Sequence, residues 1–422
     1  MGYFHWIKGG IESIQLDIVG FLAVLGEGSV LINAQVAALS QVTYLPRFMP
    51  APQALIQPSR AHKLKSHNGY TTAVRSGNVR DYINHIGHIL VNSEHYPAYS
   101  VRCVEIKRKH EPGAHDDSHS LEAKKHNSTK NESITSKAYG PLWFVAVTGC
   151  SLSIITFAFA IRERDGMALL SIILLSFLSS LVGIANKWKL QLPKRLNKNQ
   201  FTPPGDVVIR YAKGSFLIVQ CTEDVARELF FAPEDIEYLI QEAWEYRLIS
   251  LVGTITLMFG VIFLGNASVY LQLGIAGSYI IMNVLYWIVA ALPSRLHWDV
   301  SCFVVEDQVI APCDSELPEA RHGRKYIDYN KTFTTALWKA IVVTKETEWA
   351  VRSSAVPSHP AWTEWLKLAK VKAREAGTRE EKVGNKTIKV WDLPEWNSQL
   401  ALSTCFEKAA EIAAKLEQEE QV

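Results

Sequence analysis

Two long blocks of the chain are almost entirely uncharged, and polar sequence flanks both. The first covers 138–186 and is broken only by RERDG at 162–166, and the second covers 248–294 without any charged residue. A helix rises about 1.5 Å per residue and the hydrocarbon core of a bilayer is about 30 Å thick, so each block can cross twice. The pattern predicts a polytopic α-helical membrane protein with four spans arranged as two transmembrane helical hairpins.

Each block contains a segment suited to the turn of its hairpin. The first, residues 138–186, is expected to turn at RERDG, and the second, residues 248–294, at the stretch Gly265-Asn266-Ala267-Ser268. The alternative is that these are buried core helices of a large soluble protein. Such helices rarely stay uncharged on every face for about 20 residues, so the bilayer is the favoured environment.

A third apolar stretch, residues 18–40, is interrupted by Glu27, Asn33 and Gln35. A carboxylate at the centre of a span costs about 2.5–3.5 kcal/mol on insertion scales. All three apolar stretches end in Leu-Pro followed by Arg: LPRF at 45–48, LPKRL at 192–196 and LPSRL at 292–296. Proline stops a helix and arginine can reach lipid phosphate, so the repeat favours membrane contact here too. An in-plane or re-entrant helix, a fifth span and a soluble core element all stay open.

Basic residues gather at one end of the first hairpin. Nine flank it opposite its tip: Lys124, Lys125, Lys130, Lys137, Lys187, Lys189, Lys194, Arg195 and Lys198. The tip itself offers Arg162 and Arg164 beside two acidic residues, and the second tip has no basic residue. The positive-inside rule therefore predicts a multi-pass protein of an endomembrane, such as the endoplasmic reticulum, or of the plasma membrane, with both tails cytosolic.

Six residues at or just beyond the span ends are predicted to mark the membrane interfaces: Trp143, Trp188, Arg195, Trp287, Arg295 and Trp298. The net charge of the whole chain is only +2. No global field therefore attracts nucleic acid, and the expected partners are the lipid bilayer and proteins on the cytosolic side.

The polar regions between and around the hairpins divide into four parts. An N-terminal region, 1–100, precedes the charge-rich stretch 101–137, which is too poor in apolar residues to form a core and is predicted to be a disordered linker. Residues 187–247 contain two apolar runs joined by a glycine turn, followed by acidic helix starts near Glu223 and Glu234. They predict a compact module with one β-hairpin and two helices.

The C-terminal region, 295–422, is predicted to be mostly helical after an initial extended stretch. Its last helix places apolar residues at helical spacing among charges, at Leu400, Phe406, Ala410, Ala413 and Leu416. Such a helix packs either on its own domain or on a partner protein, and the first is the more common arrangement.

Three stretches, PPGDVVIRY to FAPEDIEYLI, LPSRLHWD and ALWKAIVVTKETEWAVRS, carry a resemblance to known sequences. From about residue 140 to the C-terminus the chain resembles a family of integral membrane proteins of filamentous fungi. The resemblance implies the same membrane topology and a fungal source. It carries over no activity, cofactor or site residue.

The closest approach to a metal site is the trio His85, His88 and His95, since neutral imidazole is a common metal ligand. Surface histidines on a short helix are the favoured explanation of this spacing, because histidine boxes that flank the spans are missing from the sequence, so no metal or other cofactor is predicted. The six cysteines show no paired spacing, and the chain has no phosphate-binding loop, dinucleotide fingerprint or G-x-S-x-G motif.

No ionisable residue lies within the four predicted spans, which disfavours a channel or transporter, since proton- and ion-coupled carriers place such groups in the bilayer. The leading hypothesis is a non-catalytic endomembrane scaffold or adaptor whose cytosolic parts bind other proteins. The alternative is a membrane-bound accessory protein or enzyme of a fungal biosynthetic pathway.

Overall fold

The computed structural model describes residues 27–56, 60–92, 96–109, 134–191, 202–312, 326–383 and 386–420. The chain forms two compact units. The helical unit comprises Met1–Lys63, Glu132–Gln191 and Asp235–Val300, and the sheet unit comprises Leu64–Asn131, Leu192–Glu234 and Ser301–Val422. Each unit is therefore assembled from three stretches that are distant in sequence.

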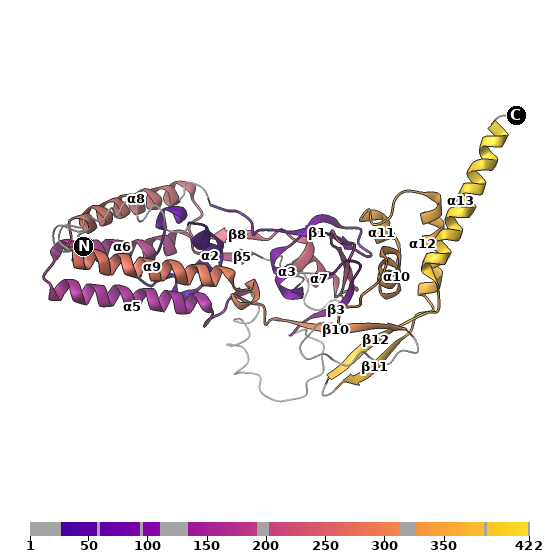
Figure 1. Cartoon of the computed structure of the whole chain (residues 1–422), viewed down its shortest axis with the longest axis horizontal. Coiled ribbons are helices and arrows are strands. Elements are labelled where there is room, and N and C mark those ends of the chain that lie inside the picture. The colour runs from indigo at the N-terminus through magenta and orange to yellow at the C-terminus, as the bar shows by residue number, and fades with distance from the viewer. Residues whose placement is uncertain are drawn as a thin grey trace, which may run out of the picture. The chain divides into compact units, whose positions relative to one another are not determined.

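The helical unit is built on four long helices that run beside one another (Figure 1). They are α5 (Pro141–Arg162), α6 (Gly166–Ala185), α8 (Ala243–Gly265) and α9 (Val269–Ala291). By length and composition all four could cross a membrane. They coincide with the four predicted spans, and each uncharged block folds back at the predicted turn.

The tips of the two hairpins are tied together by Asp165. One carboxylate oxygen accepts a hydrogen bond from the backbone N–H of Ala168 (3.0 Å), which caps α6, and the other accepts from the N–H of Ser268 (2.7 Å), which precedes α9. The two tips therefore lie at the same end of the bundle, and the opposite end is called the base below.

Helix α2 (Glu27–Leu39) packs against α9, where the Asn33 side chain donates to the backbone oxygen of Tyr286 (3.2 Å). Helix α2 begins at the first described residue, and residues 18–26 of the predicted membrane-contacting stretch lie outside the described part of the chain. Short elements complete this unit: η2 (Gln41–Tyr44), η3 (Pro52–Leu55), β4 (Thr135–Ser136), β5 (Trp188–Gln191), β8 (Asp235–Tyr238), η5 (Ser294–Leu296) and β9 (Trp298–Asp299).

The sheet unit contains an eight-stranded sheet of order β11-β12-β10-β3-β7-β6-β1-β2. Its strands are β1 (His67–Ala73), β2 (Val79–Ile83), β3 (Val101–Arg108), β6 (Val207–Arg210), β7 (Phe216–Gln220), β10 (Phe303–Pro312), β11 (Thr378–Val383) and β12 (Lys386–Leu393). The pairs β3–β7 and β10–β12 are parallel, and the other pairs are antiparallel. Segments from before, between and after the two hairpins thus form one sheet.

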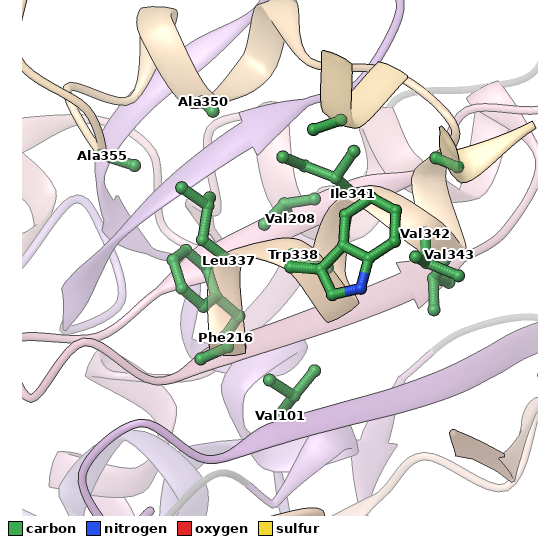
Figure 2. Packing of buried hydrophobic residues seen from close by; sticks show 14 of the residues in the cluster. Val101, Val208, Phe216, Leu337, Trp338, Ile341, Val342, Val343, Ala350 and Ala355 are labelled. Carbon is green, nitrogen blue, oxygen red and sulfur yellow. The ribbon is translucent and has the colours of Figure 1, made fainter. Parts of the chain in front are cut away.

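Helices cover this sheet because its central strands are apolar on both faces. They are α3 (His85–Val91), α7 (Glu223–Ala226), which continues as the π-helical turn η4 (Arg227–Phe231), α10 (Phe333–Thr344), α11 (Glu348–Arg352), α12 (Pro360–Ala373) and α13 (Ser398–Glu420). Figure 2 shows Leu337 and Ile341 of α10 in the core that includes Val208 and Phe216 of the sheet.

Three predictions about the polar regions need correction. Residues 101–108 are not part of a disordered linker but form the central strand β3, in which Val101, Cys103, Val104 and Ile106 are buried. Residues 110–133 of the predicted linker lie outside the described residues. The stretch after Pro233 is the strand β8 and not a helix, and the C-terminal region contains the hairpin β11–β12.

The predicted β-hairpin of residues 187–247 is present as β6–β7, and the predicted helix after Thr222 is present as α7. The hairpin turn requires Gly214, which has φ +69° in the left-handed region. These elements are not a separate module, because β6 and β7 lie inside the eight-stranded sheet.

Candidate functional site

The segment after α2 enters the helical bundle from the base and leaves by the same end. At its start, the backbone oxygen of Ser40 accepts from Lys187 Nζ (3.0 Å), and near its end the oxygen of Leu55 accepts from Asn186 Nδ2 (3.3 Å). Lys187 and Asn186 both follow the C-terminal end of α6 at the base. Between these points lie Arg47 and Phe48, which are 3% and 0% exposed. Residues 40–56, called the re-entrant segment below, thus form a loop inside the bundle.

Serine hydroxyls from two candidate spans bind the extended backbone of the re-entrant segment. The N–H of Arg47 donates to Ser179 Oγ of α6 (3.0 Å), and the N–H of Phe48 donates to Ser153 Oγ of α5 (3.0 Å). From Ser180 of α6, Oγ donates to the oxygen of Tyr44 (2.9 Å). Buried non-helical backbone must have its N–H and C=O groups satisfied by the protein, which is what these hydroxyls do.

The guanidinium of Arg47 is held by its own loop. Nη1 donates to the backbone oxygens of Val42 (3.2 Å) and Leu45 (3.1 Å). The sequence had suggested that this arginine, in LPRF, reaches lipid phosphate, but its burial shows that it fixes the curvature of the re-entrant segment instead. Phe48, next to it, packs on Tyr279 with ring centroids 5.3 Å apart.

The residues predicted to mark membrane interfaces fall into two groups. Trp287 is 67% exposed and Arg295 is also exposed, whereas Trp143 is half-buried. Trp188 and Trp298 are 2% and 1% exposed and pack against each other with ring centroids 6.2 Å apart. Their burial leaves no ring surface for lipid headgroups, so these two rings serve as packing at the base. Arg195 lies outside the described residues.

Three histidines meet in the sheet unit, but not the predicted three. His67 of β1 stacks on His88 of α3 (centroids 3.7 Å apart), and His67 Nε2 lies 3.0 Å from His85 Nδ1. His95 lies outside the described residues. Among the residues that the structure describes, no group of three or more His, Cys, Asp or Glu side chains could hold a metal ion. Sequence spacing could not reveal His67, because strand pairing brings it to α3 from 18 residues away.

The electrostatics of this cluster are set by burial. Burial, aided by the nearby His67 and His88, lowers the pKa of His85 to about 4. Burial also raises the pKa of Glu234 to about 7, although its carboxylate accepts hydrogen bonds from the backbone N–H groups of His85 (2.7 Å) and Ile86 (2.8 Å). The cluster therefore holds a neutral imidazole beside a carboxyl group that titrates near neutral pH.

The stability of the sheet unit is expected to contain a pH-dependent term from His85. Between about pH 6.5 and pH 4 the unfolded chain binds a proton on this imidazole that the folded chain does not. The free energy of unfolding therefore decreases as the pH falls through that window. His85→Gln removes this term. The free energy of unfolding of the variant minus that of the parent should be about 2 kcal/mol higher at pH 5 than at pH 7.5.

Thermal unfolding of the detergent-solubilised protein at pH 7.5, 6.5 and 5.0 measures this difference. His62→Gln is the matched control, because His62 is exposed and lies outside the cluster. Glu234 titrates in both the parent and the His85→Gln variant, so its contribution cancels in the comparison. A difference between parent and His85→Gln that does not change with pH would contradict the assignment.

The last helix, α13, offers an apolar surface that its own unit does not cover. Its inner face begins with Ala401, Cys405 and Ala409, which pack on the core of the sheet unit. The same helical face continues with Ile412 and Leu416, which are 61% and 56% exposed. Figure 1 shows this part of α13 projecting beyond α12. The face from Ala409 to Leu416 is called the α13 stripe below.

No protein-family model, curated protein or solved structure matches the chain. The resemblance to fungal membrane proteins thus stays a prediction.

Proposed function

We propose that the chain is an integral membrane scaffold whose four long helices anchor it in a bilayer and whose sheet unit docks a partner protein on the cytosolic side. The anchor is supported by the four helices that are long and apolar enough to span a membrane. The base of the bundle carries Lys137, Lys187 and Arg295, which supports placing it toward the cytosol.

The observation that carries the docking proposal is the α13 stripe. An interface already exists between the inner face of α13 and the rest of the sheet unit, and the same face runs on past the N-terminal end of α12, whose cap residue His359 packs on Phe406. Full burial of an isoleucine or leucine side chain contributes about 1.5–3 kcal/mol. Two such side chains at helical spacing, Ile412 and Leu416, are the anchors that a helix of a partner would use.

The charge around the stripe indicates the chemistry of the partner. Residues 407–420 contain five glutamates and only two lysines, so this part of α13 is acidic. A second copy of α13 would bring two acidic helices together and is therefore disfavoured. We infer that the occupant is a basic amphipathic helix of a different protein, whose apolar face continues the interface that α12 begins.

Site-specific photocrosslinking in the native membrane tests this proposal. A photoreactive residue at Ala413, on the flank of the stripe, should crosslink to a distinct protein through a basic amphipathic segment that mass spectrometry identifies. Ile412→Glu with Leu416→Glu should reduce that product about a hundredfold, because both anchors lose their apolar contact. Ala414→Glu, on the opposite face of the helix, adds a charge without touching the stripe and should leave the product unchanged.

Two outcomes would contradict the proposal. Crosslinks formed only between copies of this chain would make the stripe a homodimer contact. A product that survives Ile412→Glu with Leu416→Glu would show that the stripe does not bind the captured protein.

A further inference from the structure

An apolar groove runs along the outside of the helical unit between α5 and α9, near the base. It has a volume of about 390 Å³. Tyr139, Phe144 and Thr148 line one wall, and Leu285 and Ile288 line the other. Its lining includes large exposed side chains, since Tyr139 is 77% and Phe144 60% exposed. The groove is large enough for a small-molecule site and open on the side that a bilayer would cover.

The groove is closed toward the middle of the bundle. A methyl group added at Gly149 of α5 would lie 2.7 Å from Cε of Met282 of α9, so the two helices touch directly just past Thr148 and Leu285. From Pro141 to Thr148, α5 rises roughly 10 Å, which is the length of the groove along the helix. A ligand therefore enters from the base end or from the side, and its apolar part ends near Gly149.

Two cations lie in the chain segments that flank the groove at the base, Lys137 two residues before Tyr139 and Arg295 six residues after Val289. Lys137 and Arg295 are both exposed, and the backbone N–H of Lys137 donates to the oxygen of His297 (2.9 Å), which brings the two segments together. Tyr139 packs edge-on against Trp143 with ring centroids 5.5 Å apart and forms an aromatic rim. An apolar channel with a cationic, aromatic mouth is complementary to an acyl chain that carries an anionic headgroup.

We propose that this groove binds one anionic glycerophospholipid of the leaflet at the base, with one acyl chain between α5 and α9 and its phosphate near Lys137 and Arg295. The inference rests on the proposed membrane location of the helical unit. A sterol is the main rival, because Lys137, Tyr139 and Leu142 follow the order of a short sterol-contact motif. Leu142, however, is only 7% exposed and does not line the groove, so this arrangement favours the phospholipid.

Native mass spectrometry of the full-length protein, released from a mild detergent, tests the proposal. The parent protein is expected to retain one anionic phospholipid per chain. Leu285→Trp fills the groove and should lower that retention at least tenfold. Ile281→Trp adds the same indole to an exposed position of α9 outside the groove and should leave it unchanged.

A second pair of variants separates the headgroup from the chain. Lys137→Gln with Arg295→Gln should abolish the preference for anionic over zwitterionic phospholipid when the protein is reconstituted in mixtures of the two. Arg162→Gln with Arg164→Gln, at the tip of the first hairpin, should not change the preference. These substitutions leave the apolar walls intact, so they still test the proposal if Leu285→Trp fails to fold.

Retention of a sterol instead of phospholipid, or equal retention by the parent and Leu285→Trp, would overturn the proposal. Failure here is distinguishable from failure of the scaffold proposal, because crosslinking at Ala413 reports on α13 alone. It is also distinguishable from an error in membrane location, which labelling of the hairpin tips tests without any bound lipid.

Discussion

Gly183→Leu is expected to lower the melting temperature of the solubilised protein by about 5–10 °C and to expel the re-entrant segment from the bundle. A Cβ atom at Gly183 of α6 would lie 2.4 Å from the backbone oxygen of Thr43, far inside van der Waals contact. The obstacle is backbone, so no rotamer change relieves it. Overpacking of this kind typically costs about 1–3 kcal/mol, and displacement of the segment adds to that.

The added loss comes from the hydrogen bonds that the segment makes. If residues 43–48 move away, the N–H groups of Arg47 and Phe48 lose their serine acceptors on α6 and α5, and the buried guanidinium of Arg47 leaves the bundle together with the carbonyl groups of its own loop. Phe48 also leaves a fully buried position in the core of the bundle. In a cysteine-free background, a cysteine at Met49, which is 5% exposed, should change from protected to reactive toward a permeant maleimide.

Gly277→Leu is the matched control. Gly277 lies inside α9 and nothing within 4 Å would meet its Cβ atom, so leucine there should be tolerated and even favoured by helix propensity, by about 0.8 kcal/mol. An unchanged melting temperature in Gly183→Leu, together with a protected cysteine at Met49, would show that the re-entrant segment does not pack against α6.

The four long helices could be predicted from sequence because length and absence of charge are local properties. Each uncharged block had to fold back, and the helices end where Arg162 and Gly265 precede polar turns. The re-entrant segment could not be predicted in this way. Its backbone depends on Ser153 and Ser179, which lie more than 100 residues later in the chain and look like ordinary serines of a span.

The eight-stranded sheet was not predicted from the sequence, for a related reason. Strand β3 pairs with β10, so that Val104 faces Asp307 across a separation of about 200 residues, and the parallel pair β3–β7 leaves no turn signal in the sequence. Only the hairpin β6–β7, whose turn contains Gly214, had a local signature. The histidine cluster likewise needed the pairing of strands to bring His67 to His85.

The α13 stripe was partly visible in sequence. The helical spacing of its apolar residues predicted an amphipathic helix, but sequence could not show that α13 extends past the N-terminal end of its supporting helix α12. The structure supplies that boundary: Cys405 is 4% exposed and Ile412, two turns later, is 61% exposed.

The topology proposed for the membrane anchor leads to the second large expected effect. In a cysteine-free variant within sealed vesicles whose cytosolic face is outward, a cysteine at Lys213 should react at once with an impermeant reagent. A cysteine at Ser268 should react only after detergent is added. Both positions are exposed in the structure, whereas the neighbouring Ser215 is 1% exposed and would be protected for reasons unrelated to the membrane.

The contrast follows from the arrangement of the hairpins. Ser268 lies beside Asp165 at the joined tips, so that both tips must occupy one side of the membrane. Lys213 lies in the sheet unit, which is connected to the base ends of the candidate spans. A cysteine at Glu163, in the other tip, provides a matched probe that should behave as Ser268 does.

Labelling at Lys213 and Ser268 is therefore the most direct test of a four-span anchor with cytosolic docking. Immediate reaction at Lys213 with protection at Ser268 until detergent is added is the expected result. Protection at Lys213 would reverse the orientation and remove the cytosolic partner, and immediate reaction at both positions would contradict the spanning of the membrane itself.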